Sequence, residues 1–155
     1  MSMYVNFFIR RGDDFIPISD YSRNSIIYQL VSDYAEYEKI KPLTIKSLQD
    51  LIARARKRKE EARKTIDHIK ERIKNMRNLA ETWDEALEYL EDYETAILEY
   101  EEEIKEARYA QHFFNFLEDI IDTVRYDSES KYNYNEYIYA GIEIGRPNME
   151  DIICQ

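Results

Sequence analysis

The chain has 155 residues and a formal net charge of −10 at pH 7, and 44% of its residues are hydrophobic. This length and apolar content predict one folded domain with a single core. Three glycines, three prolines and one cysteine exclude a glycine-rich nucleotide-binding fold, a disulfide framework and a zinc site built from cysteines.

The N-terminal residues predict a β-hairpin. Residues 4–9 alternate between two faces of a strand, with Val5, Phe7 and Ile9 on one face and Tyr4, Asn6 and Phe8 on the other. Residues 10–14 are expected to form a turn, and residues 15–18 a second short strand. Pro17 suits an edge strand, because it has no N–H group to donate to a neighbouring strand.

A short helix and then a long one are expected next. Ser22 is expected to cap the short helix, which ends near Tyr37, ahead of Pro42. Over residues 45–80 apolar side chains recur in alternating steps of three and four. This spacing predicts a long amphipathic helix with a coiled-coil seam, which only Lys59 interrupts.

A second long helix is predicted to begin at Trp83 and end near Tyr126, because Thr82 and Glu85 form a capping-box sequence. Two such helices with a break between them predict an antiparallel hairpin, in which residue i lies opposite roughly residue 162 − i. The seam of the second helix is expected to contain Trp83, Leu87, Leu90, Tyr93, Ile97, Tyr100, Ile104, Ala107, Phe114, Leu117, Ile121 and Val124.

The expected fold class is α+β, predominantly helical, in a single domain. Residues 127–135 are loop-like, and residues 136–144 alternate again as a last strand. Its inner face is expected to carry Ile138, Ala140, Ile142 and Ile144. Residues 45–126 then form a long antiparallel helical hairpin, a coiled-coil-like stalk. Residues 1–44 and 127–155 form a head from a small antiparallel β-sheet and the short helix.

The two halves of the stalk carry opposite charge. Residues 45–81 hold 12 basic and 6 acidic side chains, and residues 82–126 hold 3 and 14. The basic run at residues 54–64 suggests nucleic-acid binding, but it lies opposite residues 98–108, which contain five glutamates. We therefore expect internal ion pairing that sets the register, with Lys59 near Glu102 or Glu103.

The outward face of the second helix is a candidate binding surface for a basic protein. The net charge repels nucleic acid and anionic membranes, and a row of carboxylates can imitate a phosphate track. A solvated helix face is the alternative interpretation. This face holds Glu88, Glu91, Asp92, Glu99, Glu102, Glu103 and Glu106, and the last four are the candidate partner-binding residues.

Catalytic and metal-binding motifs are missing from the sequence. It has no nucleophile elbow, P-loop or zinc-metalloprotease motif. Its two histidines, His68 and His112, lie about 27 Å apart along the predicted stalk, and neither belongs to a Glu-x-x-His motif. We expect a protein that is not an enzyme and has no cofactor or metal. No apolar run or leader predicts a membrane span or signal peptide, so a cytoplasmic location is expected.

The 14 tyrosines suggest a second binding surface. Tyr4, Phe8, Tyr137 and Tyr139 share the outer face of the predicted sheet, where no remaining element covers them. An exposed aromatic patch of this kind is typical of interaction sites, self-association included. The alternative is that these side chains form cross-strand pairs that only stabilise the sheet.

These features predict a non-enzymatic protein-binding module. The leading hypothesis is a virus-encoded inhibitor that occupies a host defence or nucleic-acid-processing protein in the host cytoplasm. A structural homo-oligomer, such as a virion or scaffold component or a homodimer, is one alternative. A protein that sequesters a small ligand such as a nucleotide is another.

Overall fold

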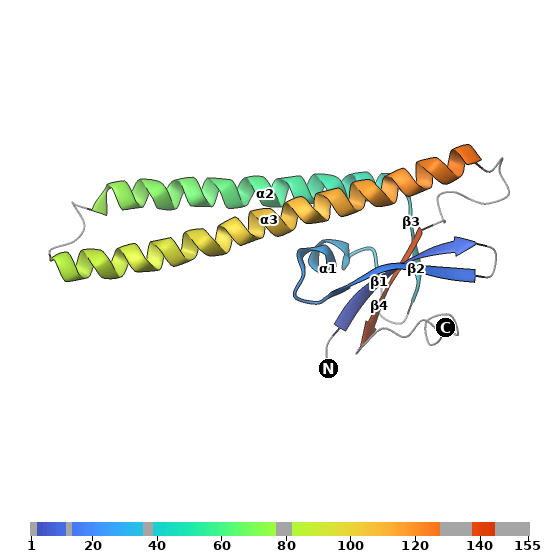
Figure 1. Ribbon diagram of the computed structural model, residues 1–155, viewed down its shortest axis with the longest axis horizontal. Coiled ribbons are helices and arrows are strands. Elements are labelled where there is room, and N and C mark those ends of the chain that lie inside the picture. The colour runs from blue at the N-terminus through green and yellow to red at the C-terminus, as the bar shows by residue number, and fades with distance from the viewer. Residues whose placement is uncertain (1–2, 12–13, 36–38, 77–81, 128–137, 145–155) are drawn as a thin grey trace.

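The helical hairpin crosses one face of a small β-sheet in the computed structural model, which describes residues 3–11, 14–35, 39–76, 82–127 and 138–144 (Figure 1). At the end where they are connected, the two long helices extend well beyond the sheet. The expected stalk and head are thus confirmed. In chain order the elements are β1 Met3–Arg11, β2 Asp14–Ser22, α1 Ile26–Val31, β3 Lys41–Leu43, α2 Ile45–Lys74, α3 Trp83–Asp127 and β4 Ile138–Ile144.

The sheet has four antiparallel strands in the order β2-β1-β4-β3. The predicted hairpin is confirmed, and Pro17 lies on an edge strand as expected. The register of β2 shifts between Phe7 and Phe8 of β1. The sequence reading missed β3, because it took Pro42 only as a signal that ends a helix. At the edge of a sheet a proline is tolerated, since only one side of the strand is paired.

The short helix is shorter than predicted. Ser22 ends β2, where it pairs with Tyr4, and Ser25 caps α1 instead, its hydroxyl oxygen accepting a hydrogen bond of 3.1 Å from the backbone N–H of Tyr28. The helix ends at Val31 rather than near Tyr37. Once Ser22 is part of the sheet, the next serine that can precede the helix takes the capping position.

Both long helices begin at a side-chain cap. Thr44 and Ser47 form a reciprocal capping box at the start of α2, and the hydroxyl oxygen of Thr82 accepts a hydrogen bond of 3.2 Å from the N–H of Glu85 in α3. The helix α2 ends at Lys74, earlier than the predicted residue 80. Within the described ranges, neither helix has a stretch apolar enough to cross a membrane.

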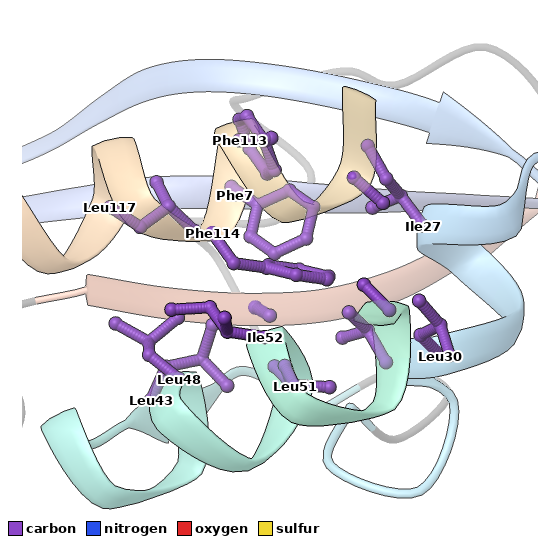
Figure 2. Close-up of a cluster of buried hydrophobic side chains, with 14 of the residues drawn as sticks. Phe7, Ile27, Leu30, Leu43, Leu48, Leu51, Ile52, Phe113, Phe114 and Leu117 are labelled. Carbon is purple, nitrogen blue, oxygen red and sulfur yellow. The ribbon is translucent and has the colours of Figure 1, made fainter. Parts of the chain in front are cut away.

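One core joins the head to the stalk. Figure 2 shows side chains from α1, α2, α3 and the sheet pointing into the same space. The ring of Phe113 lies 5.0 Å from the rings of both Phe7 and Tyr21, in edge-to-face contact. Ala55, Ala107 and Ala110 are fully buried, which fits a close approach of the helices. The largest fully buried side chains are Phe7, Phe8, Phe114, Leu43, Leu48, Leu51, Leu117, Ile121, Ile138, Val5 and Val31.

The predicted seam of α3 is wrong at its first turns. Trp83 is 75% exposed and Leu87 is also exposed. From Tyr93 to Ile104 the seam is half-buried, and full burial begins at Ala107. Two helices without a third layer enclose few large side chains, so beyond the head only Ala62 and Ile66 of α2 are buried among the described residues, and the α3 side of the seam stays half-buried.

Two phenylalanines on α3 allow the contribution of a buried side chain to stability to be compared with that of an exposed one. Phe114 is 0% exposed and Phe116 is 52% exposed. We expect Phe114→Ala to lower the free energy of unfolding by about 3–5 kcal/mol, because it leaves a cavity in the shared core. Phe116→Ala should change it by less than about 0.5 kcal/mol. Urea denaturation measures both values, and equal losses would contradict this description of the core.

Lys59 is half-buried in the α2 seam and forms no ion pair with any described residue, so its expected pairing with Glu102 or Glu103 is not seen. Lys59→Leu should raise the free energy of unfolding by about 1 kcal/mol through apolar burial. The melting temperature should then rise by roughly 2–4 °C. Lys57→Leu, at an exposed position of the same helix, is the control and should give no rise. A clear fall in the Lys59 variant would show that the charge stabilises the seam.

Candidate functional site

Phe8, a member of the predicted aromatic patch on the sheet, is not exposed. Phe8 is 1% exposed and packs against Phe15 and Ile40, with the ring of Phe15 edge-on at 6.3 Å. The prediction that Phe8 is exposed is therefore wrong. Sequence alternation places Phe8 on the face opposite Phe7, but Phe15 and Ile40, which come from separate segments, cover it there.

The rest of the outer face gives little support for a patch. Tyr4 is half-buried, and the neighbouring Asn6 is 3% exposed. The backbone of Tyr139 pairs with Phe8 and Pro42. The side chain of Tyr139 and the whole of Tyr137 lie outside the described residues, so their role in binding stays a prediction.

The four predicted glutamates come together with α1 and α2 around one groove. Its volume is about 320 Å³. Glu99, Glu102, Glu103 and Glu106 line it from α3, which places them within two turns on one side of the helix. The other lining residues are Asn24, Ile26, Gln29 and Arg58.

The short helix α1 forms the second wall of this groove. Ile26, Ile27, Leu30 and Val31 are buried in the shared core, so α1 is held against the stalk by its apolar face. The side chains of Asn24 and Gln29 remain exposed and line the groove opposite the α3 carboxylates. Their amide groups can donate and accept hydrogen bonds.

Arg58 already has a partner within the groove. Its Nε donates a hydrogen bond of 2.8 Å to Glu103 Oε1, and both side chains are about one-third exposed. This pair confirms the antiparallel register, which places residue 58 opposite about residue 104. Glu99, Glu102 and Glu106 form no ion pair with the described residues and stay available to a cation from outside.

Arg54 and Arg63 of the basic run pair with residues other than the predicted glutamates of α3. Arg54 pairs with Asp33 of the head at 2.9 Å and with Asp50 of its own helix at 3.2 Å. Arg63 pairs with Glu60, one turn away on α2. Among the described ion pairs, only that of Arg58 joins the two long helices, so the basic run sets the register at one point rather than along its length.

The groove has the chemistry of a binding site for a cationic side chain. The described residues include no group of three or more His, Cys, Asp or Glu side chains that could hold a metal ion. No histidine, cysteine or serine lines the groove. Carboxylates that accept charged hydrogen bonds, next to amides that accept or donate neutral ones, suit lysine or arginine side chains of a partner.

Comparison of the chain with known protein families, with curated proteins and with solved structures finds no match. The function is therefore inferred from the residues themselves. Sequence reasoning found the glutamates because they form a dense acidic run. It missed Asn24 and Gln29, because isolated polar residues near a short helix carry no signal until the fold places them.

The Arg58–Glu103 pair provides a direct test of the groove geometry. Arg58→Glu or Glu103→Arg alone should lower the free energy of unfolding by about 1 kcal/mol, since each brings like charges together. The double exchange should recover most of that loss, with a coupling of about 0.5–3 kcal/mol. Urea denaturation of the four proteins completes the cycle, and purely additive effects would contradict the contact.

Proposed function

We propose that the chain is a non-enzymatic protein-binding module whose acidic groove receives basic side chains of a partner protein. One observation carries this proposal: Glu99, Glu102 and Glu106 line the groove without an ion-pair partner among the described residues, and the only cation there, Arg58, is paired with Glu103. A partner lysine or arginine would supply the missing charge.

The charge of the whole stalk supports this choice of partner. The segment 82–126 carries 14 acidic and 3 basic side chains, and a surface of one sign accelerates the encounter with a surface of the opposite sign. Such a field repels nucleic acid and anionic lipid.

The class of partner follows from the same carboxylates. A row of them on a rigid helix can occupy a cleft that normally holds phosphates, so the proposed partner is a protein with a basic, nucleic-acid-binding or regulatory surface. In that role the chain acts as an inhibitor by occupation. A viral origin and a host target remain predictions from the sequence.

A matched pair of charge variants tests the groove. The groove variant is Glu99→Gln/Glu102→Gln/Glu106→Gln, and the control variant Glu88→Gln/Glu91→Gln/Asp92→Asn changes the same number of exposed charges nearer the start of α3. Each protein is immobilised and exposed to a bacterial lysate at low and high salt, and the eluted proteins are identified by mass spectrometry.

The wild type and the control variant should retain the same basic protein, and the groove variant should lose at least tenfold in affinity. High salt should weaken the complex. Equal retention by both variants would contradict a role for the groove. Recovery of the chain's own oligomer alone would favour the structural alternative.

A further inference from the structure

The two helices of the stalk carry opposite charges that remain largely unpaired within the chain. Among the described ion pairs, only Arg58–Glu103 joins α2 to α3. Exposed basic side chains of α2 that form no ion pair with any described residue are Arg56, Lys57, Lys64, Lys70, Arg72 and Lys74. Charges of both signs are therefore available to a molecule outside the chain.

The apolar seam between the two helices is incompletely covered beyond the sheet. Figure 1 shows the connected ends of α2 and α3 extending well past it. We call residues 59–76 of α2 and 83–104 of α3 the distal stalk. Its half-buried apolar side chains follow one another in steps of three and four, with no charged residue in either row, so the seam is continuous. They are Ile69, Ile73 and Met76 on α2 and Leu90, Tyr93, Ile97, Tyr100 and Ile104 on α3.

One edge of this seam lies on the side of the stalk away from the groove. Leu90, Ile97 and Ile104 are seven residues apart, and helical geometry puts them on the opposite side of α3 from Glu99 and Glu106. The described part of the head lies on the groove side, where α1 forms a wall. A second pair of helices can therefore cover the opposite edge, as in a four-helix bundle.

Charges of opposite sign flank this edge at matching positions. On α3 the exposed Glu94 and Glu101 lie beside the seam, and on α2 the exposed Arg63 and Lys70 do, with the acidic Asp67 between them. Both pairs are seven residues apart, so each forms a row along its helix. The antiparallel register places Arg63 and Glu101 within one turn of each other in height, and Lys70 and Glu94 likewise.

Two-fold symmetry makes this edge complementary to itself. An axis parallel to the stalk turns a second hairpin so that its α3 lies against α2 of the first copy at the same height, and the reverse contact forms at the same time. Basic rows then face acidic rows twice. An axis across the stalk would instead bring α2 against α2 and α3 against α3, where like charges repel. The charges thus select the parallel axis.

The area of the edge suits a weak but specific dimer. The distal stalk is about 30 Å long at 1.5 Å per residue, and two helices side by side are about 20 Å wide. A second hairpin stacked on it covers about 600 Å² on each copy. About 1,200 Å² in total lies at the lower end of the range for specific interfaces.

We propose that the distal stalk binds a second copy of this chain to form a four-helix bundle. Arg63 and Lys70 of one copy face Glu101 and Glu94 of the other, and the half-buried seams cover each other. The contact uses the side of the stalk away from the groove, so it goes beyond the proposed function. The dimer presents two open acidic grooves to a partner.

A charge exchange between the two helices tests the contact. The acid-to-base variant is Glu94→Lys/Glu101→Lys, and the base-to-acid variant is Arg63→Glu/Lys70→Glu. All four positions are exposed, so both variants should fold, which circular dichroism checks. The control is the groove variant Glu99→Gln/Glu102→Gln/Glu106→Gln, which changes charges of α3 outside this contact.

Sedimentation equilibrium over about 1–100 µM in reducing buffer measures the dimer dissociation constant. Wild type and the groove variant should dimerise with constants within about threefold of each other. Each charge variant alone should dimerise at least tenfold more weakly, because its two helices then carry the same sign. An equimolar mixture of the two charge variants should form a heterodimer, identified by its mass in native mass spectrometry, since both contacts are complementary again.

A wild type that stays monomeric over the whole range would overturn the proposal. So would a dimer that neither charge variant weakens, or a mixture that forms no heterodimer. Equal weakening by the groove variant would place the contact on the wrong face and overturn it too. These outcomes are distinct from failure of the proposed function, because a monomeric chain that captures a basic protein through the groove would leave the groove proposal standing.

Discussion

Phe113 and Phe114 of α3 join the head to the stalk, and the position of every exposed surface depends on this contact. Adjacent residues on a helix point about 100° apart, so one helix can pack against two neighbours at once. Phe113 meets the sheet through Phe7 and Tyr21, while Phe114 is fully buried in the same core. The Tyr21–Tyr109 hydrogen bond lies at the edge of this contact. Burial raises the pKa of the Tyr21 hydroxyl, which favours its protonated form.

This attachment leaves α3 with three different faces along most of its length. One is buried against α2 and the head, one carries the carboxylates of the groove, and one is exposed to solvent and carries single apolar side chains among charged ones. A chain of 155 residues that spends much of its length on two long helices has little material left to cover the outer faces. The acidic surface therefore remains open.

The groove contributes two different physical terms to the proposed binding, because carboxylates and Ile26 both line it. Carboxylates attract a basic partner over distances up to about 10 Å at 0.1 M salt, which affects the rate of encounter and its dependence on salt. Apolar contact is short-ranged and stabilises the docked complex roughly in proportion to the area removed from water.

Local patterns in the sequence determined the two long helices, the cap at Thr82, the terminal strands, and an antiparallel register that Arg58–Glu103 confirms. Periodicity and capping depend on residues close in the chain, so they can be read without the fold. The third strand, the cap at Ser25, the burial of Phe8 by Phe15 and Ile40, and the exposure of Trp83 were decided only by the tertiary structure. Each depends on where residues distant in the sequence pair or pack, and periodicity carries no information about that. The acidic run of α3 is likewise visible in the sequence, but the groove exists only because α1 packs beside that run in the fold.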